Sequence, residues 1–67
     1  MWVKSQDNRI LKKCDSFCVE ASVNRRKYAV LGNGVALGEY KSEEEALKVL
    51  DLIYGCIKQS IHYFHMP

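Results

Sequence analysis

Residues 42–59 read SEEEALKVLDLIYGCIKQ and contain two independent signals of an amphipathic helix. Ser42 and Glu45 have the spacing of a capping box, in which the serine hydroxyl accepts from the amide of residue 45 and the glutamate reaches back to the amide of residue 42. Apolar side chains then recur at helical spacing and form one stripe, at Ala46, Val49, Leu50, Ile53 and Ile57. The sequence therefore predicts a helix over about residues 43–59, with this stripe facing a sheet.

The same helix has more apolar surface than one small sheet can cover. Leu47 and Tyr54 widen the stripe on one flank, and Leu52 and Cys56 widen it on the other. A chain of 67 residues buries only about 60% of its unfolded surface, yet 48% of this one is hydrophobic. We expect these four residues to form an interface with a second copy of the chain. The alternative is that loops or the C-terminal segment cover them.

The segments on either side of the helix predict short strands. Residues 1–5 and 10–11 flank a polar cluster and suggest a first hairpin, and residues 17–23 alternate with their apolar side chains on the odd numbers. Asn33-Gly34 lies between two apolar runs and indicates a second hairpin with a type I′ turn. Gly38, inside the last strand of that hairpin, indicates a bulge or a close approach of another group. Residues 61–66 are expected to form a C-terminal strand.

These elements predict a single α+β domain over residues 1–67, in which a small, mostly antiparallel sheet of hairpins packs on one helix. The three cysteines are an odd number, and no signal peptide precedes the first strand, so we expect reduced thiols and a cytoplasmic protein. No apolar run reaches the roughly 20 residues that a membrane span needs.

A basic cluster and an aromatic C-terminus are the candidate binding residues. Guanidinium and ammonium groups hold phosphate and a tyrosine can stack on a base, which favours an anion site formed by Arg25, Arg26, Lys27 and Tyr28 with Tyr63 and His65. The alternative for the cluster is a solvated turn between strands. The net charge of +2 is too small to be a signature of nucleic-acid binding.

Catalytic and metal chemistry find little support in the residue spacing. Cys14 and Cys18 are four residues apart, and His62 and His65 are three apart, which superficially gives two pairs of zinc ligands. Neither pair lies on a recognisable knuckle, and no nucleophile has a base and an orienting group at a suggestive spacing. We therefore predict neither an enzyme, nor a metal site, nor a cofactor.

Three strings resemble a family of very short hypothetical proteins from phages and mobile elements of Gram-positive bacteria. They are MWVKSQD at residues 1–7, LGEYKSEEEALKVLD at 37–51 and YFHMP at 63–67. The resemblance implies an accessory protein that counters host defence, for example a homo-oligomeric sponge for a cyclic or ADP-ribose-derived nucleotide signal. The alternatives are a protein-binding inhibitor of a host enzyme and a weak nucleic-acid-binding module on the basic strands.

Overall fold

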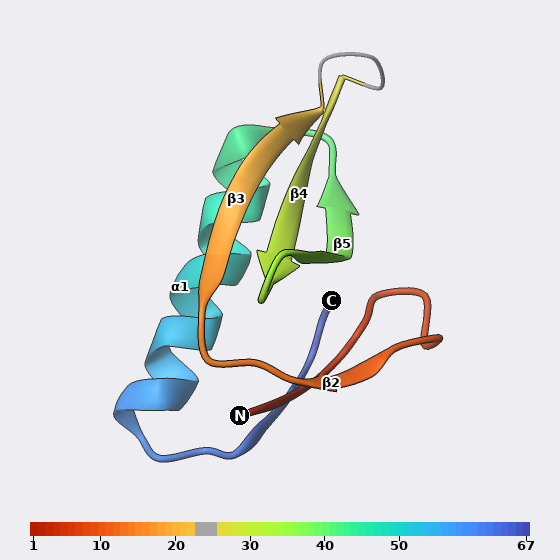
Figure 1. The fold of residues 1–67 in the computed structure, drawn as a ribbon. Coiled ribbons are helices and arrows are strands. Elements are labelled where there is room, and N and C mark those ends of the chain that lie inside the picture. Colours follow the sequence, from red (N-terminus) through yellow and green to blue (C-terminus); the bar gives the residue numbers. More distant parts are fainter. Residues whose placement is uncertain (23–25) are drawn as a thin grey trace.

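The computed structural model describes residues 1–22 and 26–67. Within these ranges the elements are β1 (Trp2–Lys4), β2 (Leu11–Lys13), β3 (Phe17–Ser22), β4 (Lys27–Gly32), β5 (Val35–Tyr40), α1 (Glu43–Lys58) and β6 (Tyr63–His65). The strands form two three-stranded sheets, β3-β4-β5 and β2-β1-β6, and α1 packs along the first of them (Figure 1). The predicted α+β class with one amphipathic helix is confirmed.

The sheet β3-β4-β5 is antiparallel and contains the predicted second hairpin. Asn33 and Gly34 have φ values of 49° and 82°, the left-handed pair that a type I′ turn requires. Beyond the turn, Val30 pairs with Gly38 but the next residue of β4 pairs with Ala36, so that Leu37 is an extra residue in β5. The bulge therefore lies directly beside Gly38, as its position in the strand indicated.

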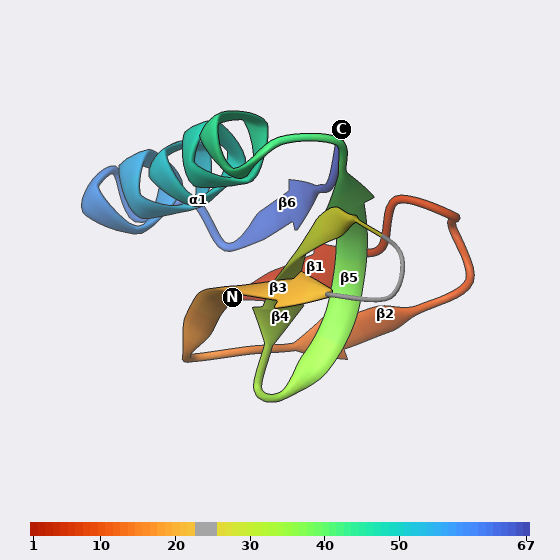
Figure 2. The ribbon, with the colours of Figure 1, turned by 90° about the horizontal axis from the view of Figure 1, so that it is seen from above.

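The sheet β2-β1-β6 joins the two ends of the described chain. β1 pairs antiparallel with β2, which confirms the first predicted hairpin, and parallel with β6, which lies inside the predicted range 61–66. Figure 2 shows β6 running between α1 and β1. The strands are thus divided between two sheets, whereas the sequence suggested one. The parallel partner of β1 is β6, some 60 residues away in the sequence, and no local sequence pattern predicts such a pairing.

The helix α1 begins as the capping box predicts, because the Glu45 amide donates to the Ser42 hydroxyl over 3.2 Å. It ends at Lys58, with Gln59 as its C-cap. Ala46, Val49 and Ile53 of the predicted stripe are buried. Ile57 is 50% exposed, so its predicted burial is wrong. It lies at the end of the helix, where it borders two surface grooves that Phe17 also lines.

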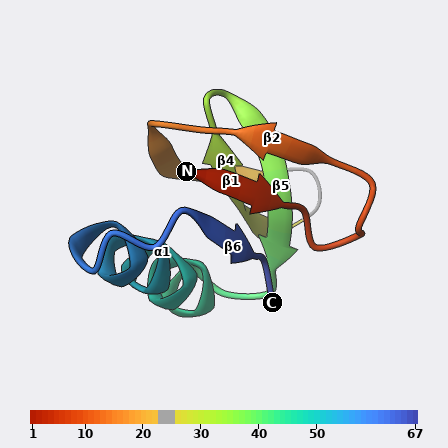
Figure 3. The same cartoon turned by 90° about the horizontal axis from the view of Figure 1, so that it is seen from below.

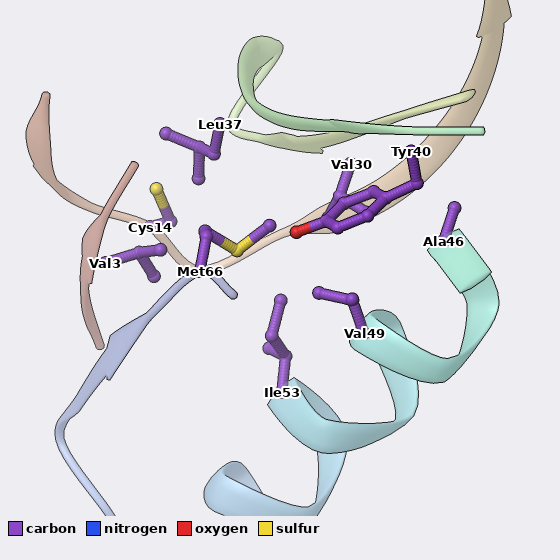
Figure 4. Close-up of a cluster of buried hydrophobic side chains, with 9 residues drawn as sticks. All are labelled: Val3, Cys14, Val30, Leu37, Tyr40, Ala46, Val49, Ile53 and Met66. Carbon is purple, nitrogen blue, oxygen red and sulfur yellow. The ribbon is translucent and has the colours of Figure 1, made fainter. Parts of the chain in front are cut away.

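The core is shared by both sheets and the helix. Its buried members are Val3, Cys14, Val30, Leu37, Tyr40, Ala46, Val49, Ile53 and Met66. Figure 4 shows the side chains of α1 pointing toward Tyr40 and Met66, with Val3 and Cys14 on the far side of Met66. Val3 of β1, together with Cys14 just after β2 and Met66 just after β6, thus completes an interior that β3-β4-β5 and α1 leave open.

Among the described residues, the polar side chains that connect the sheets across their boundary include those of Asn33 and Gln6, together with the Tyr40 hydroxyl, which donates to the main-chain oxygen of Pro67 (3.0 Å). The Asn33 side-chain oxygen accepts from the amides of residues 15–16 (3.1 and 3.0 Å), in the connection from β2 to β3. The Gln6 side chain accepts from the Glu39 amide (3.0 Å) and donates to the main-chain oxygen of Pro67 (3.1 Å). Each side chain bridges segments far apart in sequence and fixes the position of one sheet relative to the other.

Candidate anion-binding site

A pocket lined by cations lies at the end of the sheet β3-β4-β5 where α1 begins. It has a volume of about 380 Å³ and is lined by Ala21, Ser22, Arg26, Lys27, Tyr28 and Lys41. We call it the basic pocket. The strand register explains its composition, because Ser22 pairs with Lys27 and Ala21 with Tyr28, while Tyr28 also pairs with Tyr40, the residue before Lys41.

The basic pocket has an excess of positive charge at close range. Arg26, Lys27 and Lys41 contribute three cations to its wall, and its lining contains no acid among the described residues. Arg26 and Lys27 are exposed, as is Lys41, and no described side chain forms a salt bridge with any of the three. An anion entering the pocket would therefore meet cations that are not neutralised by the described part of the chain.

The backbone at Arg26 is held in an uncommon conformation. Its φ of 52° lies in the left-handed region, which costs a non-glycine residue of the order of 1 kcal/mol. The residue directly precedes β4 and lines the basic pocket at the point where the strand begins.

The predicted ligand residues fall into separate groups. Arg26, Lys27 and Tyr28 come together in the basic pocket, and Arg25 lies outside the described residues. Tyr63 and His65 belong to β6 of the other sheet and do not line this pocket within one chain.

Sequence reasoning missed Lys41 and Ser22 as pocket residues. Lys41 could have been found from the hairpin, since the Asn33-Gly34 turn sets the register that brings the end of β5 beside the start of β4. Ala21 was predicted to point inward on the odd-numbered face of β3, but it is exposed because it lies at the open end of the sheet, in the pocket wall. Val23, the last odd-numbered residue of that prediction, lies outside the described residues.

The predicted interface residues lie on two sides of α1. Leu47, Leu52 and Tyr54 are 44%, 55% and 61% exposed, and Cys56 is half-buried. On the side of Tyr54, a groove of about 330 Å³ runs between α1 and β3 and is lined by Phe17, Leu50, Asp51, Ile53, Tyr54 and Ile57. Of the four predicted flank residues, Leu47, Leu52 and Tyr54 are therefore exposed, whereas Cys56 is partly covered by the described part of the chain.

The turn between β1 and β2 contains a carboxyl group, that of Asp7, whose pKa is displaced. The Asp7 carboxylate accepts from the Ser5 hydroxyl (2.6 Å) and from the Arg9 amide (3.0 Å), and these bonds lower its pKa. Ser5 is buried, and its hydroxyl also accepts from the Ile10 amide. This network holds the turn closed and satisfies its amides, so Asp7 has a structural role.

The three cysteines differ in their accessibility. Cys14 is buried, Cys18 is exposed and Cys56 is half-buried, and burial raises the pKa of the Cys14 thiol. In the described part of the chain, no three His, Cys, Asp or Glu side chains gather into a group that could hold a metal ion.

None of the helices formed by residues 1–22 and 26–67 is both long enough and apolar enough to cross a membrane. Comparisons of the chain with family models, with curated proteins and with solved structures found no match.

Proposed function

We propose that this chain is a non-enzymatic binding protein that captures a small phosphate-bearing anion in the basic pocket and sequesters it as a homo-oligomer. The observation that carries the proposal is a wall with three cations and no described acid around a volume of about 380 Å³. That volume falls within the range of small-molecule sites, about 300–1,000 Å³. The ligand class we infer is a cyclic or ADP-ribose-derived nucleotide that serves as an immune signal of a bacterial host.

The chemistry of the wall suits a phosphate rather than a simple carboxylate. A guanidinium such as that of Arg26 can hold two phosphate oxygens at once, whereas Lys27 and Lys41 act as point charges. Tyr28 is half-buried, packs against the core and also lines the pocket, so it brings an aromatic side chain to the same wall. A nucleotide combines a charged group with a flat apolar ring, and the pocket has a complement for each part.

Self-association would stabilise so small a binding protein. The chain has an accessible surface of 4859 Å², and a typical stable interface takes about 800 Å² from each partner, roughly a sixth of that surface. The exposed flanks of α1 offer the apolar centre such an interface needs, with Leu47 and Tyr54 on one side and Leu52 on the other. A sponge requires only tight binding in a stoichiometric complex, and the proposal needs no reacting group.

Calorimetry with the purified protein tests the proposal directly. A panel of cyclic dinucleotides, cyclic mononucleotides and ADP-ribose derivatives should include at least one ligand with saturable heat. Arg26→Ala and Lys41→Ala should each weaken it by about tenfold or more, because each removes a charge-assisted contact. Arg9→Ala and Lys48→Ala are matched controls, since both residues are exposed and lie outside the pocket.

Three outcomes decide between sequestration and its alternatives. Recovery of intact ligand from the heat-denatured complex supports sequestration, whereas conversion of the ligand would identify an enzyme and overturn the proposal. Absence of heat from every member of the panel would also overturn it. Light scattering should give a mass above 7.7 kDa per particle, and Leu52→Glu or Tyr54→Glu should reduce that mass. A monomer in the wild type would reject the oligomeric part of the proposal.

A further inference from the structure

The outer face of the sheet β2-β1-β6 combines exposed aromatic rings with positive charge. Residues paired across neighbouring strands point to the same side of a sheet, and residues two apart along a strand do so as well. Since Val3 is buried in the core, its neighbours along β1 point outward. The register then gives the members of this outer face, which are Trp2, Lys4, Leu11, Lys13, Tyr63 and His65.

These six side chains form two rows across the three strands. In the first row, Trp2 lies between Lys13 on β2 and Tyr63 on β6. In the second row, Lys4 lies between Leu11 and His65. Neighbours within a row are about 4.8 Å apart along the hydrogen-bonding direction, and the rows are separated by about 6.7 Å along the strands. Figure 3 shows these strands side by side, with the sheet β3-β4-β5 behind them.

The outer face keeps large aromatic rings in solvent and surrounds them with positive charge. Trp2 is 47% exposed and Tyr63 is 76% exposed, which is unusual for side chains of this size. Lys4, Lys13 and His65 are exposed as well, and no acidic residue occupies either row.

The opposite sheet provides a comparison within the same molecule. Among the described residues, the outward positions of β3-β4-β5 include two acids, Glu20 and Glu39, and small side chains such as Ala29 and Ala36. That face has neither aromatic rings nor an excess of cations. Of the two outer sheet faces, only that of β2-β1-β6 combines rings with cations at its described positions, and this difference does not follow from the overall net charge of +2.

Bases stacked on exposed aromatic side chains, with phosphates held by nearby cations, are the means by which proteins bind single-stranded nucleic acid. Trp2 and Tyr63 supply adjacent stacking surfaces, and Lys13 and Lys4 lie beside them for the backbone. A duplex hides the faces of its bases, so it cannot use the rings. A mononucleotide would occupy one ring and one lysine and leave the rest of the face unused.

We propose that the outer face of β2-β1-β6 binds single-stranded nucleic acid, with bases stacked on Trp2 and Tyr63 and phosphates paired with Lys4 and Lys13. This site is separate from the basic pocket, which contains none of these residues.

The protein has its own reporter at the proposed site, because Trp2 is the only tryptophan in the chain. Titration with an oligothymidylate of about 12 nucleotides should quench the fluorescence of Trp2 to a saturating level. The affinity should fall as salt rises, with a logarithmic slope of about −0.7 for each phosphate neutralised. A duplex of the same length and adenosine monophosphate should bind much more weakly.

Matched variants separate the outer face from the rest of the surface. Tyr63→Ala should weaken binding by about tenfold or more, the expected effect of losing one stacked base, whereas Ile57→Ala, an exposed apolar residue at the end of α1, should not. Lys13→Ala should reduce the magnitude of the salt slope by about 0.7, and Lys48→Ala should leave it unchanged. Circular dichroism checks that each variant is folded, and Tyr63→Phe, which keeps the ring, should bind like the wild type.

Four results would overturn the proposal. They are an absence of quenching by the oligonucleotide, equal affinity for duplex, equal affinity for the mononucleotide, and equal losses in Tyr63→Ala and Ile57→Ala. A wild-type dimer that becomes a monomer in Tyr63→Ala, without oligonucleotide binding, would assign the outer face to self-association instead.

Discussion

Gly38→Ala tests whether the junction between the two sheets is packed as the structure describes. A Cβ atom at this position would lie 2.8 Å from the Tyr40 hydroxyl oxygen and 3.2 Å from both Tyr40 Cε2 and Met66 Cε. The methionine end is flexible and can move aside. Tyr40 cannot do so easily, because its ring is buried and its hydroxyl donates to the Pro67 main-chain oxygen over 3.0 Å. The substitution must therefore shift a buried ring, and we expect this shift to break the hydrogen bond of its hydroxyl.

The expected loss of stability follows from these two contributions. Overpacking of a core costs about 1–3 kcal/mol, and a typical hydrogen bond contributes about 1 kcal/mol. We expect Gly38→Ala to lower the free energy of unfolding by about 2–4 kcal/mol. A domain of this length has a total of roughly 3–10 kcal/mol at about 0.05–0.15 kcal/mol per residue, so the variant should be close to unfolding.

A double-mutant cycle with Tyr40→Phe isolates the clash. Alone, Tyr40→Phe should cost about 1 kcal/mol, and the Pro67 oxygen keeps its bond from Gln6. In the Gly38→Ala background the shortest contact disappears with the hydroxyl, so the double variant should be more stable than the sum of the single changes by at least about 1 kcal/mol. Urea denaturation followed by circular dichroism measures all four proteins. Additive changes, or a Gly38→Ala variant within about 0.5 kcal/mol of the wild type, would refute this account of the junction.

Three further changes have defined outcomes. Gly55→Ala should stabilise the protein by about 0.5–1 kcal/mol, because Gly55 is inside α1 and nothing lies within 4 Å of a new Cβ atom. Thermal melting measures the change, and a lower melting temperature would contradict this prediction. Asn33→Ala should lower the free energy of unfolding, measured in urea, by about 1–2 kcal/mol. Asn33→Gly also loses the side-chain acceptor but tolerates positive φ, so its loss of stability should be smaller. Iodoacetamide should label Cys18 quickly and Cys14 only on unfolding. The raised pKa of Cys14 disfavours its thiolate in the folded state, so the free energy of unfolding should decline as pH rises above about 9.0, the ordinary pKa of a cysteine. In Cys14→Ala, the plot of stability against pH should be flatter in this alkaline range.

The parts of the fold that were predicted correctly depend on neighbouring residues. Ser42 and the apolar stripe after it specify a helix within four turns of chain, and Asn33 with Gly34 specifies a turn within two residues. The pairing of β1 with β6 depends on residues such as Val3 and Phe64 that are distant in sequence. Three-residue strands are too short to show periodicity, so nothing in the sequence distinguished one sheet from two.

The candidate sites follow the same division between local and long-range order. Arg26, Lys27 and Tyr28 are consecutive, and the sequence therefore identified them as a cluster. Lys41 enters the basic pocket through the hairpin register, and Trp2 reaches Tyr63 only through the parallel pairing. The sequence gives the chemistry of each side chain, while the long-range register selects which of these side chains share a surface.

Because the two proposed sites lie on different sheets, a local defect can be told from a global one. Arg26→Ala acts at the end of β3-β4-β5 and should leave oligonucleotide binding intact. Tyr63→Ala acts on β6 and should leave the nucleotide heat intact. Gly38→Ala disturbs the junction that both sheets share, through Tyr40 and Met66, and should weaken both activities together. A variant that removes one activity alone has therefore lost a contact with that ligand, and its defect is not one of folding.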